Sequence, residues 1–312
     1  MKIICVTLHP AIDRVLRVPS LHPNEIARCK IEMLYGGGKG NNVARALTRL
    51  HVPVVATGYQ GSYSGAFITD HLNGEGITTD FVECKQPTRT STLVQVDDTG
   101  DTYPLYEPGQ AVEEEEIEAL LAKFKTLLPE AALVLLCGSG QTERLSSVYA
   151  DMIHLAREAN VRTLLDSSGG ALTHGIDARP YMVKVNRYEL GGYLNRDLTR
   201  REDQIMAMRD LQKQGIDIVA LSRGEEGMIA FDGAEFWEGS LQMDSIVNVV
   251  GCGDSQLAGV AKELMENASL AEIVRWGIAC GTANTQVRGA GFIDLAQVED
   301  LLPKVELQKL DQ

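Results

Sequence analysis

The sequence predicts an α/β fold in which a largely parallel sheet lies between helices, accompanied by a small second β sheet. Short apolar runs alternate with segments whose apolar residues recur at helical spacing, which is typical of parallel strands joined by crossover helices. Two further regions lack that alternation and resemble paired strands. The chain of 312 residues is long enough to bury a large core. The apolar runs occupy residues 3–8, 53–58, 133–138, 162–166, 181–185 and 217–222.

Composition and charge limit the classes of partner. The chain is 44% hydrophobic and 23% charged, which is ordinary for a globular protein. Its net charge of −14 repels nucleic acid and anionic membranes, so we expect neither as a partner. The first ten residues, MKIICVTLHP, are interrupted too early for a signal peptide, and runs such as 131–138 are too short to span a membrane. We therefore expect a cytoplasmic protein.

The cysteines and histidines predict neither a disulfide framework nor a zinc site. The chain has six cysteines, none of them in a Cys-x-x-Cys pair, and their neighbours are mostly apolar residues or glycine. Reduced, packed thiols in a cytosolic protein fit this pattern. The six histidines are scattered without the spacing of metal ligands.

The two regions without helical pattern are residues 11–35 and 88–107. Both are expected to form hairpin strands, the second turning at the sequence DDTGD of residues 97–101. No internal repeat, low-complexity tract or flexible linker separates them from the rest. We therefore expect a single domain over residues 1–312, with these two regions forming a β-sheet lid.

A glycine-rich turn, YGGGKGNNVARAL, precedes a predicted helix at residues 35–47. It is not a Walker A loop, because Lys39 is followed by Gly40 rather than by serine or threonine. It is not a dinucleotide fingerprint either, because the glycines do not follow the first strand directly. One interpretation is a flexible turn before a helix. The other is a turn whose backbone, lysine and asparagines bind hydroxyl groups and an anion.

Helix and strand boundaries elsewhere carry polar residues. The acidic run at 113–116 is expected to start a helix that continues to residue 128, as the helix dipole favours. Polar residues follow the strands at 181–185 and 217–222, where α/β sheets bind ligands. The second of these segments, LSRGEEG, is equally compatible with a tight hairpin into the following residues.

The segment VGCGDSQLAGV, residues 250–260, leaves two interpretations of Asp254 open. Leu257, Val260 and Leu264 share one face of the predicted helix, and Asp254 lies at its start. A helix-capping carboxylate explains this position. Glycine amides at the positive end of a helix also form an anion site, and a carboxylate beside it can take a proton from a hydroxyl group that attacks a phosphoryl group.

Taken together and in this order, the motifs resemble those of the ribokinase-like (PfkB) carbohydrate kinases, and more narrowly the branch that phosphorylates fructose or tagatose phosphates. The resemblance covers almost the whole chain. The motifs that carry it are TLHPAID, GGGKGNNVARAL, PTRTSTLVQV, LLCGSG, LLDSSGGAL, VKVNRYEL, LSRGEEG and NVVGCGDSQLAGV.

The resemblance implies specific roles for the matching residues. It implies that Asp254 is the catalytic base and that the turn of Gly251, Cys252 and Gly253 forms the anion hole. The sugar-phosphate site it implies consists of Asp13, Gly37, Gly38, Lys39, Asn42, Arg89 and Ser139, with Arg28 of the lid as a further candidate. The ATP side it implies consists of Lys184, Asn186, Glu189, Ser222, Gly224 and Gly227. Glu189 and Asn186 would also hold Mg²⁺, directly or through water. The family's lid often pairs between subunits, which implies a homodimer.

Several positions depart from the family pattern. Val185 replaces a proline, Arg223 stands where leucine is frequent, and Val249 replaces a serine or threonine. The run CGSGQTER keeps Ser139 but loses a proline turn at Gly140-Gln141. Cys252 stands where alanine or serine is common, and its small side chain should leave the anion hole intact. We expect these departures to alter nucleotide and sugar contacts.

The expected activity is ATP- and Mg²⁺-dependent phosphorylation of a ketohexose phosphate, with fructose 1-phosphate as the favoured substrate and fructose 1,6-bisphosphate as the product. Fructose 6-phosphate and tagatose 6-phosphate remain alternatives within the same family. A catalytically silent sugar-phosphate sensor with the same fold is the alternative from another class, and a dehydrogenase is a more distant one.

Overall fold

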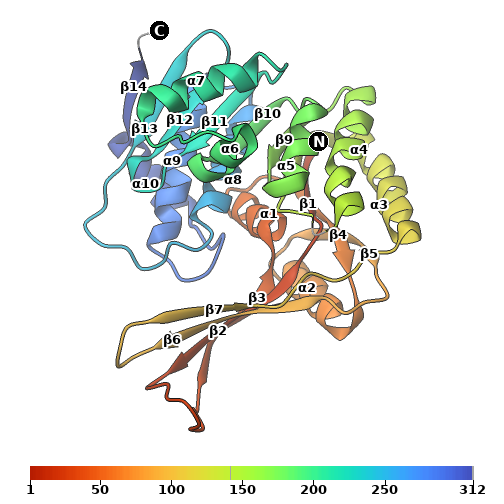
Figure 1. The fold of residues 1–312 in the computed structure, drawn as a ribbon, viewed down its shortest axis with the longest axis vertical. Helices are drawn as coiled ribbons and strands as arrows, with labels where there is room; N and C mark the ends of the chain where they lie inside the picture. The colour runs from red at the N-terminus through yellow and green to blue at the C-terminus, as the bar shows by residue number, and fades with distance from the viewer. Residues whose placement is uncertain (141, 311–312) are drawn as a thin grey trace.

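The computed structural model describes residues 1–140 and 142–310, so Gln141 of the Gly140-Gln141 departure lies outside the described residues. The described chain contains one ten-stranded sheet and one four-stranded sheet (Figure 1). From one edge to the other, the large sheet consists of β14 (Glu306–Leu310), β13 (Phe236–Ser240), β12 (Met228–Phe231), β11 (Ile218–Ser222), β10 (Met182–Asn186), β9 (Arg162–Asp166), β8 (Ala131–Cys137), β1 (Lys2–Thr7), β4 (Val54–Gln60) and β5 (Thr78–Glu83).

The large sheet is mostly parallel, as predicted. All neighbouring strands from β11 to β5 run parallel, whereas β11 to β14 form an antiparallel meander at one edge. The six predicted strands correspond to β1, β4, β8, β9, β10 and β11 with shifts of one or two residues at their ends. The expected hairpin at LSRGEEG is formed by β11 and β12, which pair in antiparallel fashion. Strands β5 and β14 were not predicted from the sequence.

The parallel strands are apolar along nearly their whole length because both faces of the sheet are covered. In β1, Ile3 and Cys5 belong to one hydrophobic cluster, whereas Ile4 and Val6 belong to the other. Successive side chains of a strand point to opposite faces, so the two clusters lie on opposite sides of the sheet. The fold is therefore three-layered, with helices on both faces.

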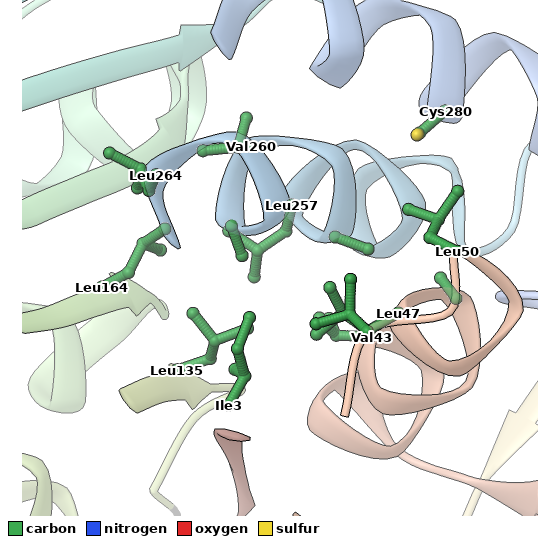
Figure 2. Packing of buried hydrophobic residues seen from close by; sticks show 14 of the residues in the cluster. Ile3, Val43, Leu47, Leu50, Leu135, Leu164, Leu257, Val260, Leu264 and Cys280 are labelled. Atoms are coloured by element: carbon green, nitrogen blue, oxygen red, sulfur yellow. The ribbon is translucent and has the colours of Figure 1, made fainter. Parts of the chain in front are cut away.

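Each cluster is completed by its own set of helices. Figure 2 shows Leu257 of α8 pointing toward the strand residues Ile3 and Leu135, with Val43 and Leu47 of α1 beside it. The helices of this face are α1 (Lys39–Arg49), α2 (Ser62–Gly74), α8 (Cys252–Met265), α9 (Leu270–Thr285) and α10 (Leu295–Leu301). Those of the other face are α3 (Glu114–Leu127), α4 (Glu143–Glu158), α5 (Gly169–Asp177), α6 (Arg187–Leu194) and α7 (Arg201–Gln212).

The predicted helix after the acidic run is confirmed as α3. Its N-terminus carries a capping box, in which the Glu113 side chain accepts from the backbone of the third helical residue and the Glu116 carboxylate accepts the Glu113 N–H at 2.7 Å. Three short 3₁₀ helices, η1 (Leu128–Glu130), η2 (Gly224–Glu226) and η3 (Leu302–Lys304), complete the elements. Within the described residues, none of the helices combines the length and the apolar character needed to cross a membrane.

The four-stranded sheet extends away from the main body (Figure 1). Its order is β3 (Lys30–Gly37), β2 (Ala11–Val18), β6 (Arg89–Val96) and β7 (Thr102–Tyr106). Both predicted hairpins are confirmed, because β2 pairs with β3 and β6 pairs with β7 in antiparallel fashion. The two hairpins join through a parallel pairing of β2 with β6, in which Asp13 lies opposite Ser91.

Candidate functional site

The first turns of α1 and α8 meet near Asp254. The N-cap of α8 is Gly251, and Asp254 is the third residue of the helix. Its Oδ2 accepts a hydrogen bond of 2.9 Å from Asn42 Nδ2 of α1. Asp254 is therefore not the N-cap residue, and its carboxylate binds a side chain from a distant part of the chain.

The Asp254 carboxyl is buried, and that burial governs its protonation. Burial raises the pKa of Asp254 to about 6, whereas Lys39 and the hydrogen bond from Asn42 act in the opposite direction. A carboxyl group that titrates near neutral pH can accept a proton from a hydroxyl group and release it afterwards. Burial thus brings the titration of the Asp254 carboxyl close to neutral pH.

The glycine turn before α8 depends on close backbone packing. Gly251 has φ of +84°, and a Cβ at this position would lie 2.3 Å from the Cβ of Ala290. The buried Asn284 side chain fixes the turn by donating to the Val250 carbonyl and accepting from the Gly291 N–H, both at 2.9 Å. The first amides of α8 have no partner within the helix and can bind an anion.

Cys252 and Gly253 follow in this turn. The Cys252 thiol lies 3.7 Å from the Asn248 carbonyl and 3.7 Å from the Asn284 Nδ2. Burial raises the pKa of the Cys252 thiol, so the group is a neutral packing element at neutral pH. Gly253 is exposed, and a Cβ there would lie 3.7 Å from Lys184 Nζ. The turn is therefore open to a ligand on the Gly253 side.

A buried carboxylate that the sequence motifs did not assign, Asp166, lies at the end of β9. Its Oδ1 accepts from Lys39 Nζ, and its Oδ2 accepts from Lys184 Nζ at 2.9 Å. Burial alone would raise the pKa of Asp166, but the two lysines outweigh it and hold that pKa below its usual value. In the sequence, Asp166 closes the buried strand RTLLD and lies in the motif LLDSSGGAL, but no role was assigned to it.

Asp13, one of the residues that the motifs assign to a sugar side, lies on β2. A Cβ at Gly37 would fall 2.0 Å from Asp13 Oδ2, so a side chain there would displace the Asp13 carboxylate. Burial raises the pKa of Asp13 to about 7, against the opposing effect of Arg45 and Arg89. Asp13 lines a cavity of about 160 Å³ between the small sheet and the turn before α8, together with Tyr35, Ser91, Asn248 and Val250.

Arg45, which the sequence analysis missed, connects the segments around this cavity. Its guanidinium is fully buried and donates to Gly36 O at 2.6 Å, to Asn42 Oδ1 at 3.2 Å and to Ala290 O at 3.2 Å. Arg45 therefore supports Asn42, the residue that binds Asp254. A charged residue among the apolar positions of NNVARAL was the available signal.

The remaining sugar-side candidates differ in position. Arg89 begins β6 and donates to Glu107 O at 3.2 Å and His9 O at 3.5 Å. Ser139 is exposed in the loop after β8, next to Gly138, whose added Cβ would lie 3.8 Å from the Lys39 Cβ. Arg28 lies in the exposed segment between β2 and β3, at the end of the small sheet that points away from the body (Figure 1). A single chain therefore does not bring Arg28 to the other candidates.

Three of the six predicted ATP-side residues line a second cavity of about 540 Å³. Ser222, Gly224 and Gly227 at the end of β11 line it together with Cys252 and Gly253 of the α8 turn. Gly227 has φ of +88°, and a Cβ there would lie 2.0 Å from Gly239 O, so this turn also requires glycine. Apolar side chains form the rest of the wall, including Leu241, Met243 and Ile246.

Three of the departures from the family pattern have clear positions. Val249 is 69% exposed and lines the larger cavity, where it replaces a hydroxyl with an apolar surface. Val185 is buried in β10. Arg223 turns away from the cavity lining, because its guanidinium binds Glu226 O at 2.9 Å and the Glu238 carboxylate.

Asn186 and Glu189 form a capping box at the start of α6. Asn186 Oδ1 accepts the Tyr188 and Glu189 N–H groups at 2.9 Å, and Glu189 Oε2 accepts the Asn186 N–H at 2.8 Å. Glu189 is also among the groups that raise the pKa of Lys39, so its charge acts on the site. These hydrogen bonds leave the other carboxylate oxygen of Glu189 for a ligand.

Comparison with known proteins identifies relatives of this chain. Relatives named 1-phosphofructokinase from Bacillus subtilis and Rhodobacter capsulatus are 30% identical over 305 residues and 33% identical over 281 residues. The first alignment covers 98% of this chain and 99% of the relative, the second 89% of each. The structure also matches the tetrameric inhibited form of phosphofructokinase-2 from Escherichia coli, with a TM-score of 0.89, 28% identity, and coverage of 97% of this chain and 98% of that chain.

The family model that matches this chain is that of the pfkB family carbohydrate kinases, over residues 1–296. Together with the relatives, it establishes a phosphotransferase that uses ATP as phosphate donor and a hydroxyl group as acceptor. The chain belongs to the pfkB family of carbohydrate kinases, as a phosphofructokinase-type sugar kinase.

Proposed function

We propose that this kinase transfers the γ-phosphoryl group of ATP to the free hydroxymethyl oxygen of fructose 1-phosphate, forming fructose 1,6-bisphosphate. The observation that carries the proposal is the position of Asp254. It is a buried carboxyl with a pKa raised to about 6, and it follows a glycine turn that lines the larger cavity. The Bacillus subtilis and Rhodobacter capsulatus relatives, both named 1-phosphofructokinase, favour this sugar over the alternatives.

In the proposed reaction, Asp254 takes the proton of the sugar hydroxyl as its oxygen attacks the γ-phosphorus and the bond to ADP breaks. The hydrogen bond from Asn42 holds Oδ2 of Asp254 in place. The amides of Gly253 and Asp254 at the start of α8 stabilise the negative charge on the transferring group, as expected for phosphoryl transfer. Closure of the small sheet over the sugar would exclude water and limit ATP hydrolysis.

The residues fit a Mg²⁺ ion that is held mainly by ATP. Among the described residues, no three His, Cys, Asp or Glu side chains are grouped as a ligand set. Mg²⁺ commonly takes one or two carboxylates and completes its shell with phosphate oxygens and water. Glu189 would supply its uncommitted oxygen directly or through water, and Asn186 would orient Glu189. Bound with ATP, the ion would neutralise phosphate charge during transfer.

A steady-state screen tests the proposal. The protein is assayed with MgATP and each of fructose 1-phosphate, fructose 6-phosphate, tagatose 6-phosphate and fructose, with ADP release as the readout. We expect the highest kcat/KM with fructose 1-phosphate. A preference for one of the 6-phosphates would overturn the substrate assignment. Release of no ADP with any of these sugars would favour the silent sugar-phosphate sensor.

We also propose that the protein is a homodimer joined through the small sheet. The β2–β3 and β6–β7 pairings place Arg14, Leu34 and Leu105 on one face, opposite the face that carries Asp13. Leu34 is 41% exposed and Leu105 is 58% exposed. An exposed apolar sheet face is typical of an association surface. Pairing of two such faces would bury these side chains.

The state of the cysteines indicates the redox conditions in which the protein works. All six are free thiols, and four of them, Cys5, Cys84, Cys137 and Cys280, are buried. Structural disulfides are typical of oxidising compartments, and their absence among these six residues agrees with reduced thiols. We infer that the protein works in a reducing compartment such as the cytoplasm.

A further inference from the structure

Asp166 joins two lysines that come from different parts of the site. Lys39 is the first residue of α1, and Lys184 lies in β10, the strand next to β9. Each binds a different oxygen of the Asp166 carboxylate, which is 1% exposed. The carboxylate is therefore shared, with one oxygen committed to each cation.

The two lysines face the two substrate regions. Lys39 lies beside Gly138, which precedes the exposed Ser139. The Lys184 ammonium lies 3.7 Å from the Cβ position of Gly253, a residue that lines the larger cavity. Both lysines act electrostatically on Asp254, because each of them lowers its pKa, whereas Asp166 raises it.

Stability alone gives little reason for this arrangement. Burying the Asp166 carboxylate and the Lys184 ammonium, with Lys39 partly buried, costs free energy that their mutual attraction offsets only with good geometry and full hydrogen bonding. Lysine is also a flexible point charge on a four-carbon stem, so it must be held to act at a fixed position. A carboxylate with both oxygens engaged restricts two such stems at once.

We propose that Asp166 is a positioning residue that holds Lys39 toward the sugar phosphate and Lys184 toward ATP, so that one buried carboxylate sets the distance between the two cations across Asp254. This inference rests on the proposed function and adds to it the coupling of the two substrate regions. Asp166 need not touch either substrate, since it acts through the lysines.

A double-mutant cycle tests the proposal. We expect Lys39→Met to raise KM for the sugar phosphate alone and Lys184→Met to raise KM for ATP alone, each about 10- to 100-fold, the usual value of a charge-assisted hydrogen bond. Asp166→Asn should raise both. In the doubles, Asp166→Asn should add little to the KM that the lysine change has already raised, because it acts through that lysine.

The proposal would be overturned if the fold-changes in KM of the single variants multiplied in the double variants. A purely structural role of Asp166 would change KM by the same factor whether or not the lysine is present. Asp166→Glu serves if Asp166→Asn does not fold, since it keeps the charge but displaces both ammonium groups. Unchanged KM values in Asp166→Glu would likewise overturn it. Asp80→Asn is the matched control, because Asp80 binds Lys123 in a half-exposed ion pair on β5, and both KM values should stay unchanged.

The outcome separates this inference from the proposed function. A wild-type protein that releases no ADP with any of the three sugar phosphates overturns the proposed function. A wild-type protein that is active, with multiplicative effects in the cycle, overturns only the role of Asp166. Melting temperatures of all variants show whether a change in KM accompanies loss of the fold.

Discussion

Asn42 of α1 and Asp254 of α8, 212 positions apart in the chain, are joined by a 2.9 Å hydrogen bond from Nδ2 to Oδ2. Arg45 in turn donates to the Asn42 side-chain oxygen, so the amide orientation is fixed and its NH₂ group points at the carboxylate. One oxygen of Asp254 is thereby engaged. In the proposed reaction, the other oxygen accepts the proton of the sugar hydroxyl.

Replacement of Asp254 by Asn should abolish most of the activity and leave the fold intact. The substitution keeps the size of the side chain but removes the proton acceptor, so kcat should fall by about 10²- to 10⁴-fold. Asp254 is not the N-cap of α8, so no cap is lost, and at pH 4, where the native wild-type carboxyl is protonated, the melting temperature should change little. Stopped-time ADP release and thermal unfolding measure the two effects.

The matched control is Asp70→Asn, which changes the same residue type on the surface of α2. Its kcat should equal that of the wild type. Near-normal turnover in Asp254→Asn would return Asp254 to a structural role.

The raised pKa of Asp254 should make the free energy of unfolding depend on pH. The native carboxyl titrates at about 6 rather than at its usual 3.8, so between these values the native state binds more protons than the unfolded state. The contribution of this carboxyl to the free energy of unfolding is therefore fully present below pH 3.8 and is lost as the pH rises through 6. At 1.36 kcal/mol per pH unit the loss is about 3 kcal/mol.

The Asp254→Asn variant lacks this titration and provides the comparison. Denaturant unfolding of both proteins from pH 4 to pH 7 should show the variant gaining stability relative to the wild type as the pH rises. A constant difference across that range would mean that the native carboxyl titrates normally. Unfolding is preferable to kinetics here, because a phosphate monoester also titrates near pH 6.

The glycine turn before α8 should not tolerate a side chain. In Gly251→Ala, the new Cβ would lie 2.3 Å from the Ala290 Cβ, and φ of +84° disfavours any residue with a Cβ. We expect a loss of about 1 to 3 kcal/mol in the free energy of unfolding, with a larger fall in kcat as the amides move. Gly192→Ala is the control, because a Cβ in that helical position meets nothing within 4 Å. Equal stability of the two variants would contradict the prediction.

The sequence predicted the parts of the fold that depend on local pattern. Continuous apolar runs predicted the central parallel strands, and the glycine-rich start of α8 was recognised from its residues. The edge strand β5, Thr78–Glu83, was not predicted, because its sequence TTDFVE mixes polar and apolar residues as an edge allows.

The motifs name candidate site residues, whereas the roles that long-range packing creates were missed in the sequence. Arg45 reaches the carbonyl of Ala290, 245 positions away, and Asn284 holds the turn at Val250 and Gly291. Asp166 gains its role only because β8, β9 and β10 are adjacent in the sheet and α1 begins beside them. Such contacts depend on topology, which no local spacing encodes.

A charge on the exposed face of the small sheet should disrupt the proposed dimer. Leu105→Glu would place a carboxylate on the proposed paired face, on the edge strand β7, where burial without a partner is costly. Light scattering should show a monomer at concentrations where the wild type is a dimer. Glu118→Gln, on the exposed surface of α3, is the control and should leave the mass unchanged. A wild-type monomer would contradict the proposal directly.

The last prediction is that Arg89 makes this an enzyme of phosphorylated sugars. The net charge of −14 repels a dianionic substrate, so binding must come from local cations. The hydrogen bonds of Arg89 to Glu107 O and His9 O are long, at 3.2 and 3.5 Å, and its buried Nε has no hydrogen-bond partner within the described chain. Such a weakly bound guanidinium can reorient and donate two parallel hydrogen bonds to a phosphate.

Arg89→Ala should therefore lower kcat/KM for the sugar phosphate by about one to two decades, since a charge-assisted hydrogen bond contributes about 1.5 to 3 kcal/mol. KM for ATP should stay unchanged, because Arg89 lies at the small sheet and not at the larger cavity. Arg196→Ala removes a surface ion pair with Asp210 and should leave both values unchanged. Unaltered sugar kinetics in Arg89→Ala, or a wild-type enzyme equally efficient with free fructose, would mean that the sugar's phosphate is not recognised at Arg89.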